Sequence, residues 1–267
     1  MKASGYAGLI ACALLGAVVL PRPAIAHDPD VLWKIVHGRC LPSLRANHTP
    51  APCVSVDIAG GETTGFAVLK DIEGPSQYLL IPTGKITGIE SPAILAPGAT
   101  NYFAHAWDAV TLVDERLGRV LPRRDLALAI NSESGRSQNQ LHIHIDCISM
   151  SARAALDRAA MHIGTHWQML PRRLALHRYR AIWLPGQELG DTNPFQVLAR
   201  SLADPETEMA RHTLVLVGSE RHGQPGFILL DGKASALSTT LSPRIKLGSG
   251  SGEELEDHTC RIAQDRS

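Results

Sequence analysis

Two histidines, His142 and His144, lie in a segment of alternating polar and apolar residues, QLHIHIDC at 140–147. Successive side chains of a β-strand point to opposite faces, so the polar residues of this segment are predicted to share one face: Gln140, His142, His144 and Asp146. Imidazoles two residues apart in a strand have Cα atoms about 7 Å apart, at a rise of ~3.4 Å per residue. The two rings can therefore meet at one phosphate group or at one metal ion.

A metal site is one chemistry open to this row, because His-x-His-x-Asp offers three ligands. The pattern resembles the opening of the metallo-β-lactamase signature HxHxDH, but Cys147 stands at the closing position. That signature also lies on a loop, whereas isoleucines alternate with the histidines here. A half-exposed strand can also carry two histidines without a function. We assign no metal-ligating residues.

Nucleophilic catalysis at phosphorus is the chemistry that we favour. A neutral imidazole attacks a phosphoryl group, and water then hydrolyses the covalent phospho-imidazole. The loop before the strand, SESGRSQN at 132–139, offers hydroxyl, amide and backbone donors for phosphate oxygens. Arg136 in this loop is a candidate phosphate clamp, because a guanidinium group presents a planar fork of donors.

The strands that must position this row form an antiparallel pattern. Apolar runs at 65–70 and 77–82 flank the turn DIEGPS and predict a hairpin. Further strands are predicted at 126–131 and 141–148, on either side of the polar loop. A strand pair around LVLVGS and GFILLD is expected in the second half of the chain.

Helices are predicted between and after these strands. A short helix follows Asp28-Pro29, and a longer one over 100–117 ends at Gly118. Three more are expected at 151–170, after Asn193-Pro194 and at 253–264. Antiparallel strands with helices between them predict a single α+β domain, with additional helices and a strand pair in its C-terminal half.

The N-terminus has the features of an export signal. Lys2 precedes the apolar run Ala7–Leu20, and Ala24-Ile25-Ala26 offers a signal-peptidase site. The run is shorter than the about 17–25 residues that span a bilayer, yet an uncleaved anchor that draws in neighbouring residues stays open. We therefore expect a signal peptide or membrane anchor at 1–26 and the domain at 27–267. The domain is either periplasmic or held at the inner membrane facing the periplasm.

Export leaves four cysteines in the mature part, an even number in an oxidising compartment. Three pairings are possible in principle. Cys40 and Cys53 flank a short proline-rich segment, which favours Cys40–Cys53 and Cys147–Cys260. A zinc site is disfavoured because no two cysteines have Cys-x-x-Cys spacing.

The charge balance excludes a nucleic-acid reader. Lys and Arg number 26, Asp and Glu number 26, and the formal net charge is +0. Loss of residues 1–26 removes Lys2 and Arg22 and no acidic residue, so the mature domain is slightly acidic. Contact with a membrane is therefore expected to depend on an N-terminal anchor or an apolar groove rather than on basic residues.

An Asn at a strand end, a Gly/Ser-rich loop and a strand of alternating residues together resemble the histidine triad superfamily of nucleotide hydrolases and transferases. The motif of that superfamily is His-φ-His-φ-His, with φ apolar. The segments KDIEGPSQYLLIPTGKITGIESP and AINSESGRSQNQLHIHIDCIS, with the four exported cysteines, resemble more narrowly the bacterial CDP-diacylglycerol pyrophosphatase family. This resemblance extends over nearly the whole mature chain, and it implies a histidine triad-like antiparallel sheet.

The resemblance assigns roles to individual residues. His142 matches the nucleophile, and His144 matches a partner of the phosphate and the leaving group. The first triad position is Gln140, which forms hydrogen bonds but does not titrate. The remaining candidates for substrate and phosphate binding are Asn131, Arg136, Ser137 and Asn139.

The implied reaction is hydrolysis of CDP-diacylglycerol to CMP and phosphatidate through a nucleotidyl-histidine, with no cofactor. The expected partner is this liponucleotide at a membrane; no oligomeric state is predicted. Two alternatives stay open: an exported histidine triad-type hydrolase or transferase acting on other CDP-alcohols, and a non-catalytic metal- or lipid-binding envelope protein. His105 is predicted to be structural or a wall of the site near Thr83 and Lys85. Surface or capping positions are expected for His166, His177, His212, His222 and His258.

Overall fold

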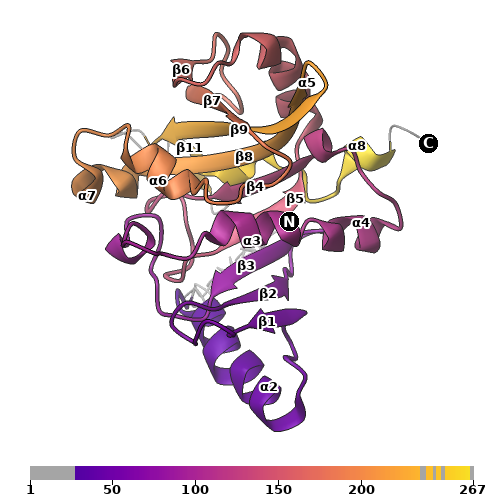
Figure 1. Ribbon diagram of the computed structural model, residues 1–267, viewed down its shortest axis with the longest axis vertical. Helices are drawn as coiled ribbons and strands as arrows, with labels where there is room; N and C mark the ends of the chain where they lie inside the picture. Colours follow the sequence, from indigo (N-terminus) through magenta and orange to yellow (C-terminus); the bar gives the residue numbers. More distant parts are fainter. Residues whose placement is uncertain (1–27, 235–238, 243–244, 248–249, 265–267) are drawn as a thin grey trace, which may run out of the picture.

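The computed structural model describes residues 28–234, 239–242, 245–247 and 250–264, with side chains for 28–234 and 250–264. The predicted signal segment 1–26 lies outside this range. A nine-stranded antiparallel sheet runs through the molecule in the order β1-β2-β3-β5-β4-β8-β9-β7-β6 (Figure 1). Its strands are β1 (Ser55–Asp57), β2 (Phe66–Lys70), β3 (Tyr78–Pro82), β4 (Leu126–Ile130), β5 (Ile143–Cys147), β6 (Gln168–Met169), β7 (Tyr179–Pro185), β8 (His212–Arg221) and β9 (Gln224–Lys233).

The remaining elements are helical, apart from a separate antiparallel ribbon of β10 (Thr239–Ser242) and β11 (Ile245–Leu247). A π-helical turn (Val36–Cys40) joins α1 (Val31–Ile35) to α2 (Leu41–Asn47). The other α-helices are α3 (Tyr102–Asp108), α4 (Thr111–Leu117), α5 (Met150–Ala159), α6 (Pro194–Ala199), α7 (Pro205–Glu208) and α8 (Arg261–Gln264). Short 3₁₀ turns lie at Pro92–Ile94, Arg123–Asp125, Ala160–His162, Met209–Arg211 and Gly252–Leu255, the last of which is η6. The α+β prediction is confirmed.

The predicted hairpin is present, with Phe66 opposite Pro82 and Lys70 opposite Tyr78. The predicted strand at 141–148 is shorter than expected and begins at Ile143. Its first residues bond to the loop after β3 instead, because the Leu141 N–H donates to the Ile86 carbonyl at 2.6 Å. His142 therefore lies just before β5, and His144 lies within it.

The two faces of the sheet are covered by different helices. Alternate residues of β2 and β3 pack in two apolar clusters, one with α1 and one with α3. The α1 cluster consists of Leu32, Val36, Cys40, Cys53, Ala67, Leu69, Leu79 and Ile81. Directly opposed residues of antiparallel strands share a face, and Leu79 is opposite His144. His144 therefore lies on the face that α1 covers, which we call the α1 face.

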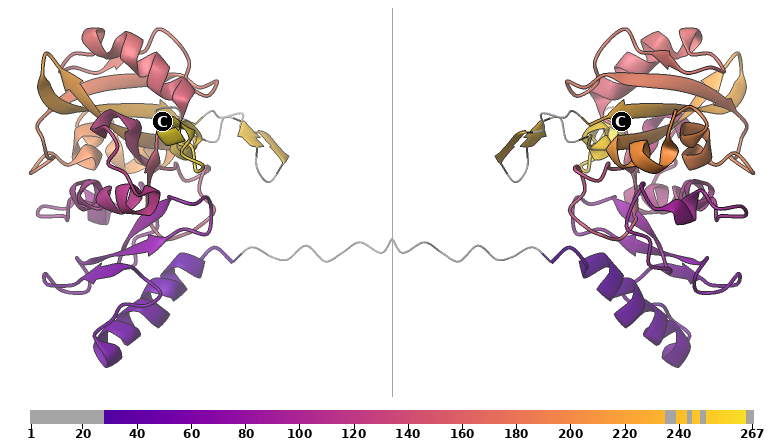
Figure 2. Two further views of the ribbon diagram at one scale, coloured as in Figure 1. Left: turned by 90° about the vertical axis from the view of Figure 1, so that its right-hand side faces the viewer. Right: turned by 90° about the vertical axis from the view of Figure 1, so that its left-hand side faces the viewer.

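The C-terminal segment, rather than a long helix, covers the middle of the α1 face. Helices α1 and α2 lie at the β1–β3 end of the sheet, and α5 lies at the opposite end (Figure 2). The segment after η6 bridges to the end of β5, where Ile148 pairs with Glu256. It lies over the polar residues of β5.

Two predicted helices are divided. The helix expected over 100–117 consists of α3 and α4, although it ends at Gly118 with φ 66°, as predicted. The helix expected over 253–264 consists of η6 and α8, because residues 256–260 are held in an irregular path by the Glu256 bridge and by Cys260. The helix expected over 151–170 ends earlier, at Ala159, and continues only as a 3₁₀ turn.

Both predicted disulfides are confirmed, Cys40–Cys53 and Cys147–Cys260. Their Cα atoms are 5.6 Å and 5.3 Å apart. Disulfides are typical of oxidising compartments outside the cytoplasm.

Within the described part of the chain, we find no helix with the length and hydropathy that a membrane span requires.

Candidate functional site

A groove of about 750 Å³ opens on the α1 face, between α1 and the C-terminal segment. One flank is apolar and comes from α1, β2 and β3: Val31, Leu32, Ile35, Leu69 and Leu79. The other flank is polar and comes from β5, the loop before it and the C-terminal segment: Asn131, Ser137, His142, His144, Glu253 and His258. His142 and His144 of the predicted row therefore lie on the polar flank of this groove, beside an apolar wall.

His142 is held in one tautomer by the backbone. Its Nδ1 lies 2.7 Å from the Gln140 carbonyl oxygen, which can only accept a hydrogen bond. Nδ1 therefore carries the proton, and a neutral ring keeps its free electron pair on Nε2. Burial lowers the pKa of His142 to about 4. At neutral pH the ring is uncharged and its Nε2 can act as a nucleophile.

His144 is oriented by a glutamine from the start of β3. Gln77 Nε2 lies 2.6 Å from His144 Nδ1, and an amide nitrogen can only donate, so the ring proton is on Nε2. His144 Nε2 faces a carboxylate oxygen of Glu253 at 3.6 Å, which is longer than a hydrogen bond. Nε2 is buried and forms no hydrogen bond with a described group, while the residue lines the groove, so this N–H is a donor without a partner beside the groove. The rings of His142 and His144 are 5.0 Å apart.

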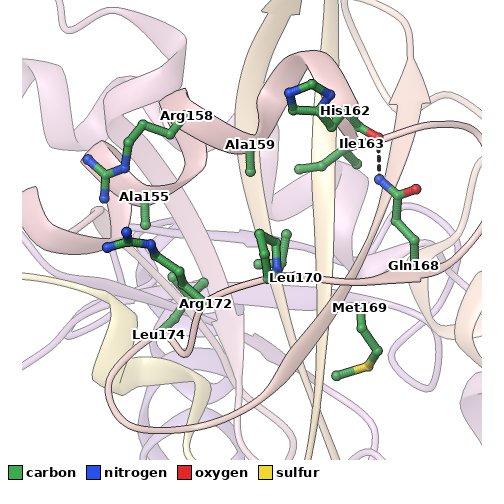
Figure 3. Close-up of a pocket in the computed structure, with 11 residues that line it drawn as sticks. Ala155, Arg158, Ala159, His162, Ile163, Gln168, Met169, Leu170, Arg172 and Leu174 are labelled. Atoms are coloured by element: carbon green, nitrogen blue, oxygen red, sulfur yellow. Dashed lines mark hydrogen bonds between the residues drawn. The ribbon is translucent and has the colours of Figure 1, made fainter.

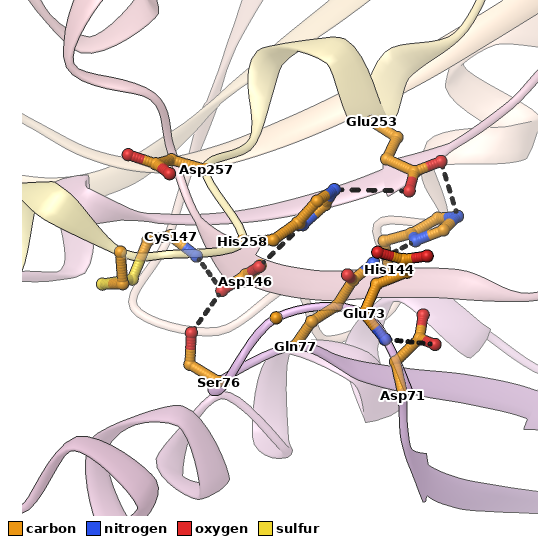
Figure 4. A network of polar contacts seen from close by, with 12 residues as sticks. Asp71, Glu73, Ser76, Gln77, His144, Asp146, Cys147, Glu253, Asp257 and His258 are labelled. Carbon is orange, nitrogen blue, oxygen red and sulfur yellow. Dashed lines mark hydrogen bonds and ion pairs between the residues drawn. A yellow bond between two sulfur atoms is a disulfide. The ribbon is translucent and has the colours of Figure 1, made fainter. Parts of the chain in front are cut away.

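Glu253 connects the two sides of the polar flank (Figure 4). It accepts a hydrogen bond from Asn131 Nδ2 at 3.1 Å, while its own backbone N–H donates to Asn131 Oδ1 at 3.3 Å. Burial raises the pKa of Glu253, but its histidine neighbours and a hydrogen bond from Asn131 outweigh burial and hold the pKa well below its usual range. Glu253 is therefore ionised, and Asn131 fixes its position.

His258 adds a third imidazole to the groove. Its Nδ1 lies 2.9 Å from Asp146 Oδ2, and its Nε2 lies 3.4 Å from Glu253 Oε1 (Figure 4). Burial lowers the pKa of His258, but hydrogen bonds to Asp146 and Glu253 raise it to about 10. The ring is therefore positively charged at neutral pH. The expectation of a surface or capping role was wrong for His258, because it bridges two carboxylates in the groove.

A buried acid, Glu256, lies next to this network. The side chain of Glu256 is buried, and both burial and the charge of Asp146 raise its pKa well above the usual range. The raised pKa of Glu256 favours its uncharged form, which limits the negative charge beside Glu253. The charged His258 offsets part of the negative charge of the groove, whose lining also includes Asp71, Glu73 and Glu254.

The structure brings only part of the predicted substrate-binding set into the groove. Asn131 and Ser137 line it. Arg136 is instead paired with Glu90 at 2.6 Å, and Asn139 is exposed outside the lining. Gln140 is fully buried, and its side-chain nitrogen donates to the carbonyls of Pro82 and Gly84. Its contribution to the groove is the backbone carbonyl that orients His142.

Asp146, the carboxylate of the His-x-His-x-Asp pattern, bonds to residues other than His142 and His144. Asp146 Oδ1 accepts hydrogen bonds from Ser76 and from the Cys147 backbone N–H, and Oδ2 pairs with His258. Across the described residues, no cluster of three or more His, Cys, Asp or Glu side chains is arranged to hold a metal ion.

The other histidines of the described residues do not line the groove. His105 stacks on Phe66, with ring centroids 4.3 Å apart, as expected for a structural residue. Thr83 and Lys85 bond to the Glu62 carbonyl and to Asp30 and do not line the groove. His212 is buried rather than on the surface, and its Nδ1 donates to Asp231 Oδ1 at 2.6 Å.

Three residues of the site were missed in the sequence: Gln77, Glu253 and His258. No local pattern gives the register that places Gln77 beside His144. A signal for His258 was present, however, because the predicted Cys147–Cys260 disulfide joins the neighbour of Asp146 to a residue two positions after His258. That pairing brings the C-terminal segment to the histidine row.

Comparisons with known proteins identify the family of the chain. The model of a family described as CDP-diacylglycerol pyrophosphatase matches residues 27–264. A Yersinia pestis protein named CDP-diacylglycerol pyrophosphatase is 40% identical over 235 residues, which cover 88% of this chain and 85% of that protein. A crystal structure of a DUF4931 family protein from Bacillus cereus has a TM-score of 0.38 and 14% identity, over 79% of this chain and 100% of that one, and carries no argument here.

The family match includes the hairpin, the histidine row and the C-terminal segment that completes the groove. From the extent of this match and the identity to the Yersinia protein, the chain belongs to the CDP-diacylglycerol pyrophosphatase family.

Proposed function

We propose that the chain hydrolyses the pyrophosphate bond of CDP-diacylglycerol to CMP and phosphatidate, with His142 as the nucleophile. Family membership identifies the chain as a hydrolase, a CDP-diacylglycerol diphosphatase. The observation that carries the assignment to His142 is its fixed tautomer. The hydrogen bond from Nδ1 to the Gln140 carbonyl and the lowered pKa leave a free electron pair on Nε2 at neutral pH.

The reaction proceeds in two displacements at one phosphorus atom. His142 Nε2 forms a bond to the phosphorus on the cytidine side, and the bond from that phosphorus to the bridging oxygen breaks. Phosphatidate leaves with the electron pair. Water then attacks the same phosphorus, the P–N bond breaks, and CMP and a proton are released.

The neighbours of His142 supply donors and position. His144 lines the groove, and because Gln77 bonds to its Nδ1, its Nε2–H can donate to a phosphate oxygen. His258 offsets the charge of Glu253, which would otherwise repel the pyrophosphate. Such preorganised donors and charges are the main contribution of protein to phosphoryl transfer.

The active site is proposed to be a variant of the histidine triad. Gln140 takes the first triad position, where it ties the strand to the loop at 82–84 and orients the nucleophile through its carbonyl. Neither task needs a titrating side chain. This is consistent with a histidine triad-like mechanism in which the first histidine is absent.

The substrate and the compartment fit the same proposal. A liponucleotide has a charged pyrophosphate between two less polar parts, and the groove has a polar flank beside an apolar one. The disulfides are consistent with the periplasm, and the lipid substrate implies association with the inner membrane.

A turnover assay tests the proposal. The full chain is incubated with CDP-diacylglycerol and the products are identified; CMP and phosphatidate are expected from wild type, and none above background from His142→Ala. His166→Ala, at an exposed histidine, is the matched control and should retain wild-type turnover. Preference for soluble CDP-alcohols would favour the broader nucleotide hydrolase. Binding without turnover in wild type would favour the non-catalytic alternative, and loss of activity with EDTA would favour a metal mechanism.

A further inference from the structure

Although the net charge of the chain is zero, one segment carries charged residues of only one sign. Residues 158–187 contain five arginines and no Asp or Glu. One of the five, Arg180, is paired with Asp231 at 2.6 Å. The other four are exposed and form no salt bridge with any described acidic residue: Arg158, Arg172, Arg173 and Arg178.

Apolar side chains accompany these arginines on the surface. Met169 is 54% exposed and Leu176 is 74% exposed. Met169 lines a small pocket of about 140 Å³ with an apolar lining that includes Ala159, Ile163 and Leu174. The guanidinium groups of Arg158 and Arg172 reach the same rim of this pocket (Figure 3). We call this surface the arginine patch: Arg158, Arg172, Arg173, Arg178, Met169 and Leu176.

The exposure of Leu176 is imposed by a tight turn. Leu174 and His177 exchange backbone hydrogen bonds of 3.0 Å and 2.8 Å, so only two residues make the turn. Both of these, Ala175 and Leu176, have positive φ, at 43° and 70°. Glycine and asparagine are the usual residues at such positions, and a leucine there costs conformational energy. The turn holds a large apolar side chain in solvent, between arginines on either side in the sequence.

The turn also adjoins the groove. His177 Nε2 lies 3.1 Å from a carboxylate oxygen of Glu254, and Glu254 lines the groove beside Glu253. The turn that carries Leu176 therefore lies next to the groove, because a single ion pair joins His177 of the turn to Glu254 of the groove lining.

We propose that the arginine patch is the surface through which the protein docks on a membrane with anionic headgroups, and that Leu176 enters the apolar layer. Arginines next to a protruding apolar side chain match the chemistry of a bilayer surface, with phosphate groups above hydrocarbon. Docking there presents the groove to a lipid whose headgroup protrudes from the bilayer. This inference rests on the proposed function for its purpose, but the docking itself is a separate property.

Local insertion can be measured without activity. Leu176→Trp is made in the full chain, and quenching of tryptophan fluorescence by brominated phosphatidylcholine is compared with wild type, in vesicles with and without phosphatidylglycerol. Added quenching is expected for Leu176→Trp in anionic vesicles. Val120→Trp, at an apolar residue that is 85% exposed away from the patch, is the matched control and should add none. Equal quenching of wild type and Leu176→Trp would overturn the proposal, whether or not the N-terminal segment anchors the chain.

Turnover then tests what docking does. With CDP-diacylglycerol in anionic vesicles, Leu176→Ser is expected to lower turnover at limiting lipid about ten-fold, the effect of losing one buried leucine. Each of Arg172→Gln and Arg173→Gln should lower it by up to roughly five-fold, and added salt should reduce these differences. A short-chain soluble analogue should be hydrolysed equally by all variants.

The outcomes separate the two proposals. Equal loss on soluble and vesicle substrates would show a structural defect and overturn the docking surface, as would an unchanged vesicle rate. If wild type hydrolyses neither substrate, the proposed function fails, and the quenching experiment still decides the docking surface.

Discussion

Replacement of His258 by Gln tests the charge network at the groove. In the folded protein His258 lies 2.9 Å from Asp146 and 3.4 Å from Glu253. Burial lowers the pKa of His258, but its hydrogen bonds to these carboxylates raise it to about 10. In the unfolded chain an imidazole has a pKa of about 6.5. The folded state therefore binds the proton of His258 more tightly than the unfolded state does.

The direction of the pH dependence follows from this difference. A group with a raised pKa in the folded state contributes its full stabilisation below its unfolded pKa, and that stabilisation is lost as pH rises through the folded pKa. The interval from 6.5 to about 10 corresponds to roughly 5 kcal/mol. The side chain is 29% exposed, so solvent screens the two ion pairs. We therefore expect them to contribute about 2–3 kcal/mol to the free energy of unfolding. The free energy of unfolding of His258→Gln should be lower than that of wild type by this amount at about pH 6, and the difference should be much smaller above pH ~10.

Urea unfolding followed by circular dichroism measures the effect. The quantity compared is the free energy of unfolding of wild type minus that of His258→Gln, at several values between about pH 6 and pH 10.5. Tyrosine and lysine titrate in both proteins, so their contributions cancel in the difference. His166→Gln, at an exposed histidine, should match wild type throughout. A difference that is absent at the acidic end, or that persists unchanged at the alkaline end, would refute the reasoning.

Three further predictions concern the same groove. Because the pKa of His142 is lowered to about 4, kcat/KM should stay level from neutral pH down to about 5 and fall about ten-fold per pH unit below 4; a limb near 6.5 would contradict this. Gln77→Leu removes the donor that orients His144 and should lower kcat about ten-fold with wild-type circular dichroism, so an unchanged kcat would show that His144 needs no such partner. Reduction of Cys147–Cys260, which closes a loop with a sequence separation of 113, should lower the free energy of unfolding by about 4–5 kcal/mol and lower turnover as well. A reduced protein with full activity and wild-type Tm would show that the disulfide does not hold the C-terminal segment in place.

Local sequence signals were sufficient for the elements around the histidine row. The hairpin of β2 and β3 follows from two apolar runs around a Gly-Pro turn, and Asn193 caps α6 as predicted. The alternation at 140–147 placed His144 on a different face from its isoleucine neighbours. Such signals depend on residues a few positions apart, which is why sequence patterns predict them.

Tertiary contacts decided the rest. The C-terminal helix was predicted from composition, but the Glu256 bridge and the Cys147–Cys260 disulfide hold residues 256–260 out of helical geometry. That irregular segment is what delivers His258 to the groove. Arg136 was predicted as a phosphate clamp from its type and loop, and its pairing with Glu90 depends on a residue 46 positions earlier. The net charge of the whole chain likewise gave no sign of the arginine patch, because acidic residues elsewhere in the chain balance these arginines.

The central claim is that His142 forms a covalent bond to phosphorus. Wild-type protein and CDP-diacylglycerol are mixed, quenched at increasing times, digested and analysed by mass spectrometry under conditions that preserve P–N bonds. We expect a peptide that carries one cytidylyl group on His142, which forms before steady state and disappears in the chase, and which is absent from His142→Ala. Turnover to CMP and phosphatidate with no such adduct at any time, or with the adduct on another residue, would contradict the mechanism.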